Sequence, residues 1–166
     1  MQKGFAALEL VLVIFIIAVL ASCAVPNAAR IIDRVALDYE TKRLYTELRF
    51  LQSHERMTSM RDSHFKIIDS ENPVTVEING THYIIKKRDP EKIYEKYFLP
   101  KGFTLSYPAN MNFKWIKFDD MGKPQSSDNS ALNGHIFITS RHGKKTKIIF
   151  DTVGRFRGER VDETVK

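Results

Sequence analysis

The apolar and polar positions divide the chain into three parts. From Phe5 to Val25 the only charged residue is Glu9, and nearly all the other positions are apolar. A helix of about 20 residues crosses the hydrocarbon core of a bilayer, so this run is long enough to span a membrane. After Pro26 the apolar positions recur at helical spacing, and after Arg61 they alternate with polar positions, as in half-buried strands. The pattern predicts a membrane-length helix, an amphipathic helix and a strand-rich head.

The second part, residues 26–60, continues the helix with one apolar stripe and charges on the other faces. The stripe consists of Leu37, Leu44, Leu48 and Leu51, with Thr41 in the gap. Pro26 lacks a backbone N–H, so we expect a kink or a loosened turn there. One helix should therefore run from Phe5 to about Met60, and its second half should pack on the head.

The third part, residues 61–166, has several short segments that predict strands. These segments are residues 64–69, 73–79, 81–87, 103–107, 113–118, 135–140 and 146–150. Asn79-Gly80 favours a hairpin, because both residues accept positive φ, and residues 141–145 should form a tight turn. Residues 90–98 are expected to be a polar insert with one helical turn, and residues 119–133 a loop. The predicted fold class is α+β: a long N-terminal helix packed on a small antiparallel β-sandwich.

Composition, charge and motifs limit the classes of function that the chain could have. The 166 residues carry a net charge of +6, which favours an acidic partner such as nucleic acid or an anionic membrane surface. A single cysteine, Cys23, excludes an intrachain disulfide and a cysteine metal cluster. The five histidines show no i, i+4 pair, and Gly143-Lys144-Lys145-Thr146 lacks the upstream glycine of a P-loop. We therefore expect no enzyme activity and no cofactor.

The apolar N-terminus could also be a signal peptide. Lys3 supplies a minimal basic region, and Ser22-Cys23-Ala24 could be a small-residue cleavage site or a lipidated cysteine. Neither kind of signal explains Glu9, because a charge at the centre of a membrane helix costs about 2.5–3.5 kcal/mol.

The first residues resemble the class III leader of type IV pilins and pseudopilins. The resemblance rests on Lys3-Gly4-Phe5, on Glu9 four residues later and on the apolar run beyond; Ala6-Ala7-Leu8 replaces the family's usual Thr-Leu-Ile or similar. It implies that a prepilin peptidase cleaves between Gly4 and Phe5, which removes leader residues 1–4, and that the new N-terminus at Phe5 is methylated.

The same resemblance implies a place in the cell. Residues 5–25 would cross the bacterial inner membrane once, with the head outside the cytoplasm, and would later form the core of a pilus or pseudopilus with other pilin subunits. Glu9 would pair with the N-terminal amine of a neighbouring subunit. A buried charge that has a partner is tolerated, whereas an unpaired one is not.

The C-terminal region is strongly basic. Its cations are Arg141, Lys144, Lys145, Lys147, Arg155, Arg157 and Arg160, against the acids Asp151 and Glu159. In an extended chain Arg155 and Arg157 would share one face and Phe156 would point to the core. Two neighbouring guanidinium groups suit phosphate oxygens. A charged edge strand that prevents aggregation is the alternative.

The tail TKIIFDTVGRFRGE resembles the end of the GspH/FimT family of minor pilins and pseudopilins, and of the competence pseudopilin ComGD. FimT-like proteins that bind DNA during natural transformation carry a Gly-Arg-x-Arg motif, which is Gly154-Arg155-Phe156-Arg157 here. The resemblance implies a minor pilin that binds extracellular DNA without sequence preference through Arg155 and Arg157. The proposed helpers are Lys144, Lys145, Lys147 and Arg160. The alternative is a structural pseudopilin of a type II secretion system or a pilus tip, without DNA binding.

Overall fold

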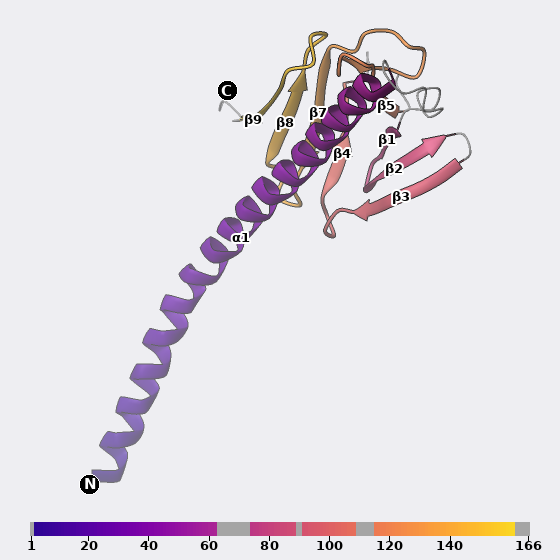
Figure 1. The fold of residues 1–166 in the computed structure, drawn as a ribbon. Coiled ribbons are helices and arrows are strands. Elements are labelled where there is room, and N and C mark those ends of the chain that lie inside the picture. Colours follow the sequence, from indigo (N-terminus) through magenta and orange to yellow (C-terminus); the bar gives the residue numbers. More distant parts are fainter. Residues whose placement is uncertain (1, 63–73, 89–90, 109–114, 162–166) are drawn as a thin grey trace.

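One long helix and a β-rich head make up the architecture. The structure is a computed structural model that describes residues 2–62, 74–88, 91–108 and 115–161. The C-terminal half of α1 (Gln2–Asp62) lies along the head, and its N-terminal half projects away from it (Figure 1). The predicted α+β class is confirmed. The strand predicted at residues 64–69 lies outside the described residues.

The projecting half of α1 is apolar and exposed. Leu10 and Phe15 expose 62% and 64% of their surface, and α1 is long and apolar enough to cross a membrane. Helix α1 includes Pro26, so the chain is helical on both sides of it. The kink or loosened turn expected at Pro26 stays a prediction.

The strands form two antiparallel sheets. The five-stranded sheet has the order β3 (Glu91–Phe98), β2 (His82–Arg88), β1 (Val74–Asn79), β5 (Trp115–Phe118) and β6 (Pro124–Gln125). The four-stranded sheet has the order β4 (Thr104–Ser106), β7 (Gly134–Thr139), β8 (Lys145–Phe150) and β9 (Phe156–Val161). The predicted hairpin at Asn79-Gly80 joins β1 to β2, and the predicted turn at residues 141–145 joins β7 to β8.

The core lies between α1 and the two sheets. All four leucines of the predicted stripe are buried, and Leu48 has no exposed surface. They share one apolar cluster with Ile136, Ile148 and Phe150 of the four-stranded sheet. Thr41 fits the gap in the stripe because its hydroxyl lies 2.6 Å from the Thr146 hydroxyl. Burying a leucine in such a cluster stabilises the fold by about 1.5–3 kcal/mol.

Residues 90–98 were predicted wrongly, because β3 is a strand that pairs along its length with β2. It is an edge strand, and both Ile93 and Tyr94 are more than half exposed. The adjacent Ile93 and Tyr94 are both exposed, and Glu95 and Tyr97 are only partly buried, so apolar and polar positions do not alternate along this strand. The loop predicted at residues 119–133 contains the two-residue strand β6.

A partly buried polar cluster attaches β3 to α1. The Arg43 guanidinium lies 3.5 Å from the centre of the Tyr97 ring, and its Nη2 donates to Glu95 Oε1 at 2.9 Å. The Tyr97 hydroxyl donates to Glu40 Oε1 at 3.0 Å. Burial raises the pKa of Glu40, although the hydrogen bond from Tyr97 opposes that shift. These contacts position the exposed edge strand against the helix.

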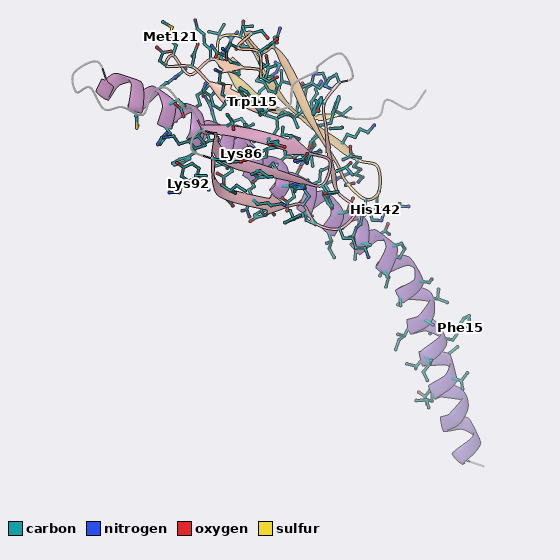
Figure 2. All side chains as sticks on the ribbon, turned by 90° about the vertical axis from the view of Figure 1, so that its right-hand side faces the viewer. Phe15, Lys86, Lys92, Trp115, Met121 and His142 are labelled. Atoms are coloured by element: carbon teal, nitrogen blue, oxygen red, sulfur yellow. The ribbon has the colours of Figure 1, made fainter. Side chains whose placement is uncertain are left out.

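The head has two distinct ends. His142 lies beside the point where α1 leaves the head, and Met121 lies at the opposite end (Figure 2). We call these the proximal end and the distal end.

Candidate nucleic-acid interface

Three tight turns of the head place a cation directly after a glycine. The glycines are Gly122, Gly143 and Gly154, with φ of 72°, 80° and 86°. Each donates its N–H to the carbonyl three residues earlier, at 2.7, 3.0 and 2.9 Å. A type I turn followed by a left-handed residue is a common hairpin connection, and glycine adopts that conformation without steric cost. The glycine of the Gly-Arg pair in the predicted motif is therefore explained by the turn, without any ligand.

The turn that carries the motif is held by Asp151. Its Oδ1 accepts hydrogen bonds from the amides of Val153 and Arg155, both at 3.0 Å, and its Oδ2 accepts from Arg155 Nε at 2.8 Å. The hydrogen bond from the Arg155 amide is the main cause of a lowered pKa of Asp151. Asp119 binds the amides of Met121 and Lys123 in the same way. The backbone at Arg155 is thus fixed by its own turn.

Gln52 of α1 holds these two turns together. Its side chain is buried, and Nε2 donates to the carbonyl oxygens of Gly122 and Gly154, each at 2.6 Å. A Cβ on Gly154 would lie 2.5 Å from the Gly122 oxygen and 2.8 Å from Gln52 Nε2. Gly154 is therefore required both by its positive φ and by this close approach.

The two arginines of the motif, Arg155 and Arg157, lie beside the junction at which Gln52 binds the two turns. Phe156 is buried against Phe118 and Phe150, at ring-centre distances of 5.8 and 6.2 Å. Arg155 and Arg157 are exposed, as alternation along an extended chain predicts. They border a hollow of about 430 Å³. The contact with Asp151 uses one of the five N–H donors of Arg155.

The other predicted cations lie elsewhere on the sheet. The β8–β9 register pairs Ile149 with Arg157 but Lys145 with Val161, four residues or about 13 Å further along. Lys144 and Lys145 therefore lie at the proximal end, together with Arg160, which pairs with Asp38 of α1. Lys147 lies between the two groups and pairs with Glu159 at 3.4 Å. The structure brings Arg155 and Arg157 together but separates them from Lys144, Lys145 and Arg160.

Two arginines that the sequence analysis missed lie near the motif. Arg49 Nη1 donates to Gln52 Oε1 at 3.1 Å, and its guanidinium lies 6.0 Å from the Phe156 ring. Arg56 Nε donates to the Met121 carbonyl at 2.8 Å. Their spacing of seven residues places both on one face of α1, which is the signal that could have found them. We call Arg49, Arg56, Arg155 and Arg157 the distal arginine group.

Comparison with known proteins yields no relative. No protein-family model matches the chain, and neither a curated protein nor a solved structure matches it. Among the described residues, no group of three or more His, Cys, Asp or Glu side chains could hold a metal ion.

The residues implied by the leader resemblance lie far from the head. Gly4 and Phe5 belong to the first turns of α1. Glu9 is exposed on the projecting half of the helix. No strand of the described head packs on this part of the helix.

Proposed function

We propose that this chain is a minor type IV pilin whose head binds extracellular DNA for natural transformation. The observation that carries the proposal is the pair Arg155 and Arg157, held exposed at the distal end by a fixed turn and by the buried Phe156. Arg49 and Arg56 add positive charge to the same end. The distal end is the part of the head furthest from the projecting half of α1, where a long ligand has access (Figure 2).

The projecting half of α1 is the proposed membrane anchor. It crosses the bacterial inner membrane once, with the head outside the cytoplasm, and later packs among other pilin subunits in the filament. This orientation rests on the resemblance to pilins. The positive-inside rule alone favours the opposite one, because Arg30 and Arg34 on the head side outnumber Lys3.

Phosphate contacts account for the proposed DNA binding. Guanidinium groups form paired hydrogen bonds with phosphate oxygens and carry no sequence information in doing so. Non-specific binding of this kind has a Kd of about 10⁻⁴–10⁻⁶ M. Several subunits on one filament would share a long DNA molecule, and their combined avidity would exceed the affinity of a single head.

The double variant Arg155→Gln, Arg157→Gln tests the DNA proposal. In a mobility-shift titration of the full-length protein in non-ionic detergent, duplex DNA should bind more weakly than to wild type. The plot of log affinity against log salt should become shallower by about 2, which corresponds to two lost phosphate contacts. The variant should unfold close to the wild-type temperature, because both side chains are exposed and an exposed ion pair such as Arg155–Asp151 contributes little to stability.

The matched control is Lys92→Gln, Lys96→Gln, which removes the same charge from the exposed strand β3. It should bind DNA like wild type apart from a small effect of net charge. Equal binding by the arginine double variant would contradict the proposed interface.

A structural pseudopilin without DNA binding is the second candidate. It is favoured by the Asp151 turn, which accounts for Gly154 and for the Arg155–Asp151 ion pair without any ligand. Absence of a mobility shift for the wild-type protein at high micromolar concentration would select this function. The anchor and the assembly role of Glu9 are common to both candidates.

Leader processing is a separate prediction. When the chain is produced together with a prepilin peptidase, mass spectrometry should find a mature N-terminus at a methylated Phe5. The Cys23→Ala variant should be processed in the same way, because Cys23 has no part in this cleavage. A mature chain that begins at Cys23 or Val25, or a loss of processing in Cys23→Ala, would instead indicate a signal peptide.

A further inference from the structure

A second group of cations surrounds a cavity at the proximal end of the head. The cavity has a volume of about 540 Å³ and lies between α1 and the β7–β8 turn. The basic side chains that line it are Arg34, His142, Lys144, Lys145 and Arg160. The one acid in the lining is Asp38, which pairs with Arg160. We call this the proximal pocket.

Asp33 fixes the β7–β8 turn beside the helix. This side chain is 1% exposed; Oδ1 lies 3.2 Å from Arg141 Nε, and Oδ2 lies 3.2 Å from His142 Nδ1. Burial raises the pKa of Asp33, but interactions with Ser140, His142 and Arg141 outweigh it and leave the pKa lowered. The ionised carboxylate thus anchors Arg141 and His142, in the turn that also contains Lys144 and Lys145. The contacts of Asp33 with the turn therefore hold Lys144 and Lys145 in the same pocket lining as Arg34.

A second turn adds to the same end. A Cβ on Gly102 would lie 2.7 Å from Arg141 Cβ, so the β3–β4 connection contacts the β7–β8 turn. Lys101 of that connection is exposed. The proximal end therefore also carries positive charge outside the pocket.

The pocket lies close to where the bilayer surface would be. Nine residues separate Arg34 from Val25, the end of the apolar run, which is about 14 Å along a helix. Each headgroup layer of a bilayer is about 5–8 Å thick. Arg34, at the edge of the pocket nearest the membrane, then lies within about one Debye length, roughly 8–10 Å, of the headgroups. Figure 2 shows His142 facing the side from which the projecting half of α1 emerges.

We propose that the proximal pocket binds the headgroup phosphates of anionic phospholipids in the membrane that anchors α1. The proposal rests on the membrane anchor proposed above. Four Lys and Arg side chains against one acid provide the charge complementarity, and the position next to the apolar run selects lipid among phosphate-bearing partners. Lys144, Lys145 and Arg160 are then assigned to the membrane, while the distal arginine group at the other end stays accessible to DNA.

The experiment uses full-length protein in two kinds of lipid nanodisc. One contains phosphatidylcholine alone, and the other contains phosphatidylcholine with phosphatidylglycerol. Amide hydrogen exchange is followed by mass spectrometry at residues 141–145, with residues 151–155 as the internal reference and residues 10–22 as the reporter of membrane insertion. Deuterium uptake at residues 141–145 should slow at least about fivefold in the anionic nanodiscs. This is the factor in membrane affinity that one cation near an anionic surface contributes.

The variant Lys144→Gln, Lys145→Gln should lose this protection, and so should wild type at high salt. The matched control Lys92→Gln, Lys96→Gln should keep it. Equal uptake in the two nanodiscs, or protection that persists in the Lys144/Lys145 variant, would overturn the proposal.

Two further arms separate lipid from other phosphates. Inorganic phosphate or a short DNA duplex is added to the phosphatidylcholine nanodiscs, and neither should protect residues 141–145. Protection by inorganic phosphate would make the pocket a free-phosphate site, and protection by DNA would make it part of the DNA interface; either result overturns the lipid proposal. Rapid exchange of residues 10–22 in both nanodiscs would overturn the anchor itself, which is distinguishable from a failure confined to the turn.

Discussion

Replacing Gln52 with leucine should lower the free energy of unfolding by about 2–4 kcal/mol, because two buried carbonyl oxygens lose their only described side-chain donor. Leucine has a similar size, so the expected loss comes from the hydrogen bonds rather than from a cavity. Chemical denaturation of the full-length protein in detergent, followed by the fluorescence of the largely buried Trp115, measures the effect.

Two variants accompany this measurement. Gly154→Ala should destabilise by about 1–3 kcal/mol, because alanine must adopt a φ near 86° and its Cβ meets the same junction. Ser53→Ala, next to Gln52 but on the exposed side of α1, should change stability by less than about 0.5 kcal/mol. A Gln52→Leu protein as stable as Ser53→Ala would show that the two turns do not depend on the helix.

The junction at Gln52 also shows what the sequence could reveal. The leucine stripe predicted the buried face of α1, because apolar spacing reports burial directly. Asp33, Glu40 and Gln52 lie four residues from Leu37, Leu44 and Leu48 and therefore fall on the same face. Each is buried, and each binds a loop or strand of the head. A polar residue on an apolar stripe thus marks a contact point, but its partner follows only from the tertiary structure.

The basic C-terminal region shows what the sequence could predict and what it could not. Charge density and alternation predicted that Arg155 and Arg157 share a face with Phe156 opposite, because that geometry is local. The division of the cations into two groups depends on the register of β8 with β9, which sequence spacing does not give. Strand β3 was missed for a related reason: its adjacent residues Ile93 and Tyr94 are both exposed, so burial does not impose an alternating pattern on this edge strand.

The turns could have been interpreted more fully from sequence. Asp119 to Lys123 and Asp151 to Arg155 share the pattern Asp-x-x-Gly followed by a cation, and the two segments form the same turn. The glycine is required by the backbone and the aspartate by its capping bonds, so neither reports a ligand. Only the exposed side chain of the cation is left for function. The DNA proposal therefore rests on the two arginines rather than on the whole motif.

The variant Glu9→Ala should enter the membrane at least as well as wild type but should be nearly absent from filaments. Insertion improves because a charge inside a membrane helix is unfavourable, by up to about 2.5–3.5 kcal/mol at the helix centre and by less near the end where Glu9 lies. Assembly fails because the N-terminal amine of the neighbouring subunit loses its partner in an apolar environment, where breaking a buried ion pair costs about 3–5 kcal/mol. Quantitative immunoblots of membrane and sheared-filament fractions from cells that assemble the protein measure both effects.

Two controls isolate the charge at Glu9. Glu9→Gln keeps the size of the side chain and should fail to assemble like Glu9→Ala, because a neutral amide does not balance an ammonium group. Ser22→Ala removes a polar group from the same projecting segment and should assemble normally, since the Ser22 hydroxyl donates to the Val19 carbonyl of its own helix at 2.7 Å. Filaments that contain Glu9→Ala at the wild-type level would show that assembly does not need the Glu9 carboxylate. This result would contradict the assembly role of Glu9, on which the pilin proposal rests.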